Sequence, residues 1–363
     1  MNGRDLTGVS RNAMVIDQFG LDDHDVRRWF PDIYQYLLDH VKPERDQNRD
    51  ARFRQNWWLF GRPRPELRKY LAGLPRYIST VETTKHRDFQ FLDISILPDN
   101  KLLNIAISDA SALGVLPSRI HVTWALAAGG RLGVGNDPVY VKTKCFDQFP
   151  FPISSENQSL AIGDLAEELD AHRKRIQADH PDITLTGMYN VLEKLKSGEA
   201  LTDSDKDVHG RGLVSVLKDL HERLDAAVFT AYGWDAGLND EEILEKLVAL
   251  NHERAREEAN GQVRWLRREY QAPDEAARAT AVQATMDVGE GVAGPARKRP
   301  WPKTLPAQFE PVRDVLDAAE TPLRAEDVAR NFSRANKNKV TEVLHTLNAL
   351  SQVHMVGDAR FAA

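Results

Sequence analysis

The fold is decided by three short stretches in the first third of the chain: Arg76-Tyr77-Ile78-Ser79-Thr80-Val81, Phe89-Gln90-Phe91-Leu92-Asp93-Ile94 and Leu102-Leu103-Asn104-Ile105-Ala106-Ile107. They are rich in β-branched and aromatic residues, and the third follows a Pro98-Asp99-Asn100 turn, which is the pattern of β-strands. Between Leu113 and Ala128 the spacing favours a short helix, followed by glycine-rich turns. Residues 50–152 are therefore predicted to form a mixed α/β unit with a twisted sheet and long irregular loops.

The residues before this unit predict a helix over 20–42. The acidic residues Asp22, Asp23 and Asp25 suit the first turn of a helix, because carboxylates are stabilised near a helix N-terminus. Apolar residues then recur every three or four positions and give the helix one apolar face. Pro31 is expected to kink or divide it.

The residues after the mixed unit are predicted to be helical from about Ile162 onward. On the first helix an apolar face is formed by Leu165, Leu169, His172 and Ile176, and Arg173 and Lys174 are expected to lie away from it. Later helices are expected at Met188–Lys196, Leu213–Tyr232 and Glu241–Trp265. This repeated spacing indicates a helical bundle or arm.

The last part of the chain is expected to contain a linker and a small domain. Residues 273–302 mix Ala, Gly, Pro and Arg with little periodicity, which is typical of linkers. Three predicted helices at Gln308–Ala319, Arg324–Phe332 and Lys337–Leu350 precede two short strands around Gly357, the order of a winged helix. The predicted class is α+β, with a helical connector (1–50), the mixed unit (51–152), a helical region (153–272), a linker (273–304) and a winged-helix-like domain (305–363).

The composition excludes several classes of protein. Hydrophobic residues make up 42% and charged residues 28% of the 363 residues, so a core can be buried and wholesale disorder is excluded. No apolar run reaches the roughly 18–20 residues that cross a bilayer. The N-terminus lacks the apolar core of a signal peptide, and the one cysteine, Cys145, excludes an internal disulfide and a multi-cysteine zinc site. We expect a cytoplasmic protein with no membrane partner.

The net charge of the whole chain is −6, which by itself would argue against nucleic acid as a partner. This total hides a difference between segments. Residues 51–152 hold 14 basic and 8 acidic side chains, a net charge of +6, whereas residues 153–272 hold 15 and 24, a net charge of −9. A basic segment therefore lies beside an acidic one. Within it a basic and aromatic cluster contains Arg52, Arg54, Trp57, Trp58, Phe60, Arg62, Arg64, Arg68 and Lys69.

This cluster is open to two interpretations. Arginine binds phosphate and reads guanine through paired hydrogen bonds, and a solvated basic surface is the alternative. A second basic group, Arg330, Arg334, Lys337 and Lys339, lies at the start of the predicted recognition helix of the winged helix. Helix-turn-helix proteins contact DNA at that position, but many winged helices serve only as protein contacts.

The sequence offers little support for catalysis. Gly135-Asn136-Asp137-Pro138-Val139-Tyr140 is similar to the (Asn/Asp)-Pro-Pro-aromatic loop of amino methyltransferases, but Val139 replaces the second proline, and a structural turn is favoured. The glycine cluster from Gly129 to Gly135 lacks the Lys-Ser/Thr ending of a phosphate-binding loop. The histidines form no metal-binding pattern, and Cys145 is interpreted as a packing residue. No catalytic, cofactor or metal residue is predicted.

Several long strings resemble the target recognition domain of MmeI-like enzymes. They are Asn56–Arg68 (NWWLFGRPRPELR), Leu74–Ile78, Val81–Arg87 and Ser118–His121. Three further segments resemble the end of that domain: Asn136–Tyr140, Cys145–Asp147 and Phe149–Pro152. Leu185–Leu192 and Ala231–Trp234 resemble the helical region that follows. The resemblance covers most of the chain, beginning at Asn2-Gly3-Arg4-Asp5-Leu6.

The resemblance implies a role in DNA methylation. The family consists of bacterial class I SAM-dependent methyltransferases of restriction–modification type, which form N6-methyladenine. It implies double-stranded DNA as the partner of residues 51–152, with Arg62, Arg64, Lys85, Arg87, Arg131, Lys142 and Lys144 as candidate DNA contacts. Trp57, Trp58, Trp124 and Tyr77 are expected to build the core of this domain.

The same resemblance exposes a departure from the family. Neither the (Asn/Asp)-Pro-Pro-aromatic motif nor a glycine-rich cofactor loop is present. We therefore expect the catalytic domain to be absent from this chain, S-adenosylmethionine to belong to the complete enzyme, and a catalytic methyltransferase domain or subunit to be a second partner. The alternatives are a non-catalytic DNA-binding or interaction protein that uses its C-terminal winged helix, and an inactive remnant.

Overall fold

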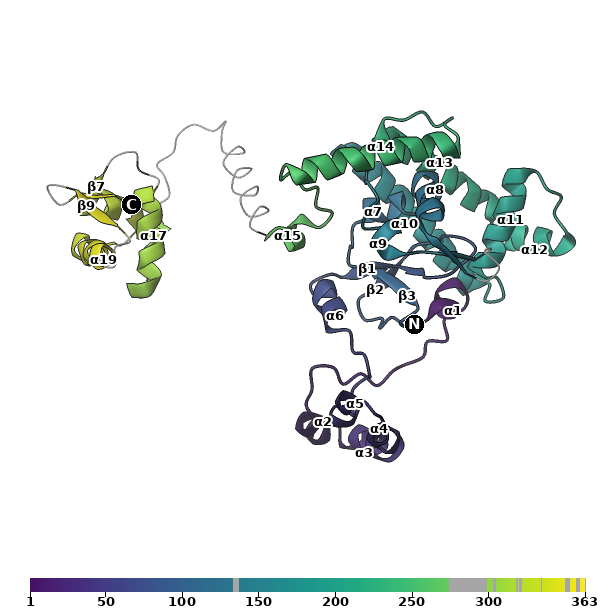
Figure 1. The fold of residues 1–363 in the computed structure, drawn as a ribbon, viewed down its shortest axis with the longest axis horizontal. Coiled ribbons are helices and arrows are strands. Elements are labelled where there is room, and N and C mark those ends of the chain that lie inside the picture. Colours follow the sequence, from purple (N-terminus) through teal and green to yellow (C-terminus); the bar gives the residue numbers. More distant parts are fainter. Residues whose placement is uncertain are drawn as a thin grey trace. The chain divides into compact units, whose positions relative to one another are not determined.

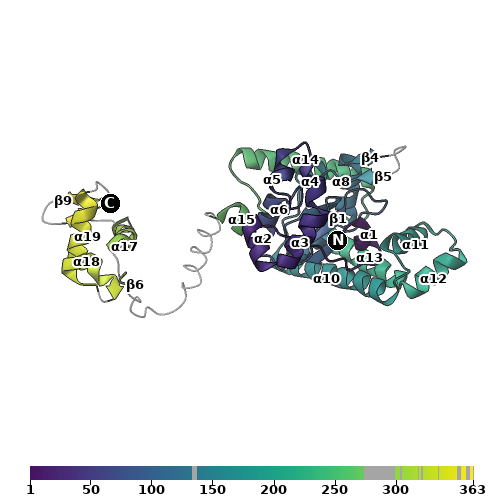
Figure 2. The same ribbon diagram turned by 90° about the horizontal axis from the view of Figure 1, so that it is seen from below.

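The computed structural model describes residues 1–132, 137–273, 299–302, 305–317, 319, 322–333, 335–349, 353–356 and 360–362. The chain divides into two compact units, Met1–Pro273 and Asp274–Ala363 (Figures 1 and 2). Almost all of the predicted linker lies outside the described residues, and so do Arg334 and Gly133 to Asn136.

Unit 1 is organised around a three-stranded antiparallel sheet in the order β2-β1-β3. The strands are β1 (Arg76–Val81), β2 (Gln90–Asp93) and β3 (Leu102–Ile105). Ile78 at the centre of β1 pairs with Phe91 on one side and with Ile105 on the other. The three predicted strands are confirmed, and β2 and β3 are shorter than predicted. The α+β class is confirmed as well.

Both faces of this sheet are covered by other elements. Successive residues of a strand point to opposite faces, so neighbouring residues of β1 belong to different cores. On one face Ile78 and Phe91 pack with residues of α7 (Ala110–Val115), α8 (Arg119–Ala128) and α9 (Lys142–Cys145). On the other face Tyr77 packs with Leu6 of α1 (Gly3–Thr7) and Leu71 of α6 (Pro65–Leu71). The predicted burial of Tyr77, Trp124 and Cys145 is confirmed.

Between α1 and α6 the chain forms four short helices (Figure 1): α2 (Asp23–Trp29), α3 (Pro31–His40), α4 (Lys42–Asp46) and α5 (Ala51–Gln55). Pro31 is the first residue of α3, so it divides the predicted helix as expected. Trp57 is buried and contacts Tyr34 edge to face at 5.4 Å. Trp58 is partly buried, and its indole N–H donates to the Leu21 carbonyl at 2.9 Å. Both tryptophans therefore hold these helices together, apart from the sheet.

The rest of unit 1 is helical: α10 (Glu156–Asp179), α11 (Leu185–Ser197), α12 (Asp203–Arg211), α13 (Val214–Tyr232), α14 (Asp240–Ala259) and α15 (Arg268–Gln271). Their apolar core, which includes Leu169 and Leu224, also contains Trp124 and Phe149. The mixed unit and the helical region predicted from the sequence therefore share one core. No helix among the described residues has both the length and the apolar character needed to cross a bilayer.

One prediction about α10 is wrong. Arg173 was expected to lie away from the apolar face, but its side chain is fully buried. The reason is that α10 packs against both α7 and α13, and its basic side chains reach the edge of the sheet at β2. Its Nη2 donates to the Phe89 carbonyl at 2.6 Å, and Lys174 Nζ donates to the Phe91 carbonyl at 2.7 Å. Two basic side chains of α10 thus occupy carbonyls along the open edge of the sheet.

Helices α7 and α10 approach each other closely at Gly114. A Cβ atom added there would lie 2.5 Å from Ile162 Cγ2 and 2.9 Å from the Ile162 carbonyl oxygen. We expect Gly114→Ala to lower the free energy of unfolding by about 1–3 kcal/mol, because the two helices must move apart. Chemical denaturation monitored by circular dichroism would measure this loss.

Gly163 provides a matched control at the same contact. A Cβ atom at Gly163 would meet its nearest neighbour, Ala110 Cβ, at 3.5 Å, an ordinary contact. Gly163→Ala should therefore leave stability unchanged or raise it by up to about 1 kcal/mol, since alanine favours a helix. Equal losses in the two variants would contradict this account of the packing.

Unit 2 has the element order of a winged helix: α17 (Leu305–Asp317), β7 (Leu323–Arg324), α18 (Ala325–Arg330), α19 (Lys337–Ala349), β9 (His354–Val356) and β10 (Arg360–Ala362). The three strands form an antiparallel sheet in the order β7-β10-β9. Val328, Val340, Leu344 and Phe361 are buried together in its core. A further short pair, β6 (Arg299–Pro300) with β8 (Phe332–Ser333), is parallel.

Candidate nucleic-acid interface

Two loops of unit 1 are joined edge to edge beside the sheet. The hairpin of β4 (Gly130–Leu132) and β5 (Asp137–Val139) follows α8, and Thr83 in the loop after β1 forms a β-bridge with Val139. The Tyr140 amide donates to the Glu82 carbonyl at 2.8 Å. Residues 82–88, 130–132 and 137–145 therefore form one surface, which we call the hairpin face. It carries Lys85, Arg87, Arg131, Lys142 and Lys144.

Arg87 ties the two loops of the hairpin face together. Its Nη1 donates to the Val81 carbonyl at 2.6 Å, and its Nη2 donates to the Pro138 carbonyl at 3.4 Å. The guanidinium also lies 5.0 Å from the centre of the Tyr140 ring. Burial lowers the pKa of this side chain. The structure therefore gives Arg87 a role inside the fold, and its role as a DNA contact stays a prediction.

Lys85 is exposed but has acidic and polar partners from the helical region. Its ammonium donates to Asn190 Oδ1 and to Glu193 Oε2, each at 2.8 Å, and both residues belong to α11. The His86 ring nitrogen Nε2 also lies 2.8 Å from Asn190 Oδ1. The loop at residues 82–88 is thus anchored to α11, and the charge of Lys85 is balanced by Glu193.

The other basic residues of the hairpin face are directed to solvent. Lys142 and Lys144 are exposed on α9, and neither forms an ion pair or a side-chain hydrogen bond within the described chain. Arg131 is exposed on β4, opposite Pro138. Exposed, unpaired ammonium groups are the kind that neutralise DNA phosphates. Lys142 and Lys144 therefore carry the available positive charge of this face.

A buried polar network supports the hairpin face from below. His121 is completely buried; its Nδ1 donates to the Leu116 carbonyl at 2.6 Å, and its Nε2 accepts from the Tyr140 hydroxyl at 3.0 Å. Burial lowers the pKa of His121 to about 4. The ring is therefore neutral at physiological pH, and its two hydrogen bonds fix the position at which the chain leaves β5 for α9.

A second network connects the helical region to the same loop. The buried Arg173 donates through Nη1 to the Tyr189 hydroxyl at 3.2 Å, and this hydroxyl lies 2.8 Å from His221 Nε2. Burial lowers the pKa of His221 to about 3, so this imidazole accepts the hydroxyl proton. No sequence pattern indicates this network, because its members come from three helices and look like ordinary helix residues.

Arg62 and Arg64 lie on another part of unit 1. They precede α6 and line a cavity of about 700 Å³ together with residues from 1–17 and 94–99, none of which belongs to the hairpin face. Both are exposed and, among the residues described, form no ion pair or side-chain hydrogen bond. The seven candidate DNA contacts are therefore divided between two places.

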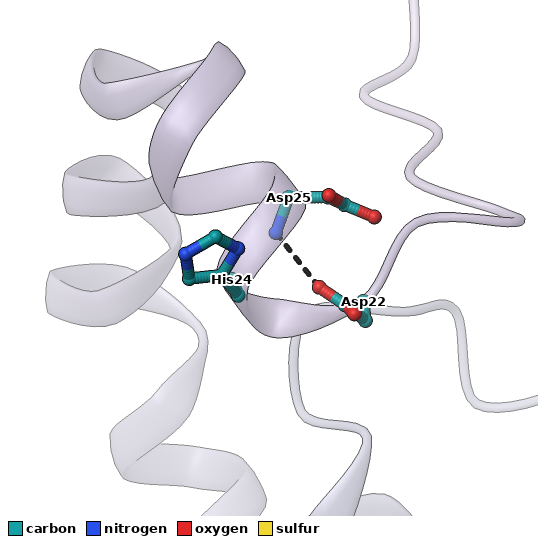
Figure 3. A group of neighbouring side chains, drawn as sticks. All are labelled: Asp22, His24 and Asp25. Atoms are coloured by element: carbon teal, nitrogen blue, oxygen red, sulfur yellow. Dashed lines mark hydrogen bonds between the residues drawn. The ribbon is translucent and has the colours of Figure 1, made fainter.

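One group of side chains has the composition of a metal site. Ligand atoms of Asp22, His24 and Asp25 lie within 4.8 Å of one another at the start of α2 (Figure 3). Asp22 Oδ1 accepts a hydrogen bond from the Asp25 amide at 2.7 Å, which caps the helix. All three residues lie at or near the surface, and helix capping accounts for the position of Asp22.

Comparison with known proteins identifies part of unit 1. Residues 7–153 match the family model of the MmeI target recognition domain. Residues 7–153 are therefore similar to a target recognition domain of the MmeI type, as the sequence motifs predicted. The match includes α2 to α5, most of which lie in the predicted connector (1–50).

Two individual proteins are similar to this chain. DNA methyltransferase A of Bacillus subtilis (strain 168) is 32% identical over 148 residues, which are 39% of this chain and 13% of that protein. The chain thus matches only a small part of the length of this curated relative. Among solved structures, the Type IIL restriction–modification enzyme MmeI in complex with DNA aligns with a TM-score of 0.46 and 19% identity, over 65% of this chain and 28% of that one.

Proposed function

We propose that this chain is the DNA sequence-recognition portion of a SAM-dependent, site-specific adenine-N6 DNA methyltransferase of restriction–modification type. The observation that carries the proposal is the match of residues 7–153 to the MmeI target recognition domain. The unpaired lysines of the hairpin face support it, because a DNA-reading surface needs side chains that bind phosphate and reach base edges.

The chemistry requires a second component. Methylation of an adenine within a duplex needs the base to be flipped into a catalytic pocket. Under this proposal, another domain or subunit supplies that pocket together with S-adenosylmethionine. The recognition domain selects the adenine by holding the duplex in one register.

Methylation assays test this division of labour. The chain is incubated with duplex DNA and labelled S-adenosylmethionine, alone and together with a catalytic methyltransferase polypeptide from the same locus. We expect label in DNA only when the catalytic polypeptide is present. Methylation by the chain alone would overturn the assignment of catalysis to another component.

Lys142 and Lys144 should anchor DNA phosphates. In the Lys142→Ala/Lys144→Ala double variant, we expect the slope of log K against log salt concentration to fall by about 2, roughly one for each lost phosphate contact. Fluorescence anisotropy with a random-sequence duplex at several salt concentrations measures this slope. Lys206→Ala on α12, where the ammonium is paired with Asp203, is the control and should leave the slope unchanged.

The C-terminal unit is a weaker candidate for the DNA contact. Arg330 is paired with Asp327 at 3.1 Å and Lys337 with Glu326 at 3.0 Å, so two of its basic side chains are already balanced by carboxylates. We therefore expect Lys337→Ala/Lys339→Ala to bind DNA like the unmodified protein. A loss larger than that of the hairpin-face variant would favour the alternative function, a DNA-binding protein that uses its winged helix.

A further inference from the structure

We propose that the cavity beside Arg62 and Arg64 binds a nucleoside monophosphate. The cavity has a volume of about 700 Å³, within the range of roughly 300–1,000 Å³ typical of small-molecule sites. Three segments line it: residues 1–17, the stretch from Phe60 to Gly73, and the turn from Ile94 to Asp99. This inference rests on the geometry of unit 1 and does not depend on the proposed function.

The charges of the cavity leave two arginines available for an anion. Arg11 is paired with Asp5 at 2.7 Å, and Arg68 is paired with Asp17 at 2.8 Å. Within each of these two ion pairs the opposite charges cancel. Asp99 accepts a hydrogen bond from the Lys101 amide through Oδ1, and it is the remaining carboxylate of the lining. Arg62 and Arg64 therefore give the cavity an excess of positive charge.

The two free arginines are suited to a phosphate group. Guanidinium groups bind phosphate through paired, charge-assisted hydrogen bonds. Arg64 is also held in the left-handed backbone region, with φ of 53°, immediately before Pro65. A residue other than glycine in this conformation is strained by roughly 1–3 kcal/mol, and such strain concentrates at ligand sites. The chain thus holds Arg64 in an unfavourable conformation two residues after Arg62.

Part of the lining is apolar and partly open to solvent. Phe60 is 42% exposed, Ile94 41% and Val15 55%, although all three line the cavity. An exposed aromatic ring beside aliphatic side chains offers a surface on which a planar base can stack. A ligand with a phosphate at one end and a planar base at the other combines both requirements, and a nucleoside monophosphate is the smallest such ligand.

Calorimetric titration of the full chain tests the proposal. Deoxyadenosine monophosphate is the ligand, and deoxyadenosine and inorganic phosphate are the comparison probes. We expect both probes to bind at least about tenfold more weakly than the nucleotide, since each lacks one half of the interaction. Binding of phosphate as tightly as the nucleotide, or no binding of the nucleotide at millimolar concentration, would overturn the proposal.

Variants locate the site. Arg62→Ala/Arg64→Ala should weaken nucleotide binding by about tenfold or more, and Phe60→Ala should weaken the nucleotide but not inorganic phosphate. Lys69→Ala is the matched control, because Lys69 is an exposed basic residue of α6 that does not line the cavity. If the arginine variant kept the thermal stability of the original protein and bound the nucleotide with unchanged affinity, the proposal would also be overturned.

Measurements of DNA binding distinguish two sources of the nucleotide, the DNA itself and free nucleotide in solution. If Arg62→Ala/Arg64→Ala also weakens DNA binding, and deoxyadenosine monophosphate competes with DNA, the cavity takes a nucleotide of the DNA. If DNA binding is unchanged while nucleotide binding is lost, the ligand is a free nucleotide. The Lys142→Ala/Lys144→Ala variant should retain nucleotide binding in either case, so failure of the nucleotide site and failure of the proposed function give different results.

Discussion

Replacing Arg173 by methionine should lower the free energy of unfolding by about 3–5 kcal/mol, the largest single loss that we expect in unit 1. Arg173 is fully buried and joins the Phe89 carbonyl of the β1–β2 connection to the Tyr189 hydroxyl of α11. Without its guanidinium these groups lose partners away from water, and Asp170, which lies 3.7 Å away, loses a neighbouring positive charge. Urea denaturation followed by tryptophan fluorescence measures the change.

Arg175 provides the control for this prediction. It lies on the same helix, two residues further along, and is exposed. Arg175→Met should change stability by no more than about 0.5 kcal/mol, as is usual for surface substitutions. If Arg173→Met lost less than about 1 kcal/mol, the buried guanidinium would not hold the helical region to the sheet as described here.

The stability of unit 1 should fall steeply with acid between pH 6.5 and pH 4. Burial lowers the pKa of His121 to about 4 and that of His221 to about 3, whereas an unfolded histidine titrates near 6.5. In this window the unfolded chain binds protons that the folded protein excludes, so stability rises with pH and is complete above about pH 7. Each of the two histidines should account for about 3 kcal/mol at pH 4.

Denaturation at intervals of pH measures this dependence. Each buried histidine contributes a slope of up to about 1.4 kcal/mol for every pH unit between pH 5 and 6. His121→Gln should remove one such contribution, whatever its effect on stability at pH 7. A variant whose pH dependence runs parallel to that of the original protein would show that folding does not lower the pKa of His121. Carboxylates with lowered pKa, such as Asp205, add their own dependence only at lower pH.

The sequence was sufficient to predict the sheet and the recognition domain, and the reasons are local. β1 was placed at its observed bounds, because its β-branched and aromatic residues favour strands. Tyr77 and Ile78 are both buried, in the cores on the two faces of the sheet. Pro31 divided the early helix as its missing amide requires. The domain family was predicted from sequence segments, such as Asn56–Arg68, that resemble MmeI-like enzymes, and the match over residues 7–153 supports that prediction.

The sequence was insufficient where a residue's partners come from distant segments. Helical periodicity assigns one buried face, so it placed Arg173 on the outside, although α10 has neighbours on two sides. A count of basic residues likewise treated Arg87, Lys85 and Lys142 as equivalent. Only their surroundings separate them, because Arg87 binds backbone carbonyls and Lys85 has Glu193, whereas Lys142 is unpaired.

The basic side chains that α10 places along β2 have a consequence for self-association. The outer strand of a sheet offers unpaired carbonyls to strands of other molecules, and such strand addition leads to domain swapping and aggregation. Here the carbonyls of Phe89 and Phe91 are already occupied by Arg173 and Lys174. A neighbouring chain would have to displace both cations before it could pair there. The sheet is thereby protected from growing by a further strand at β2.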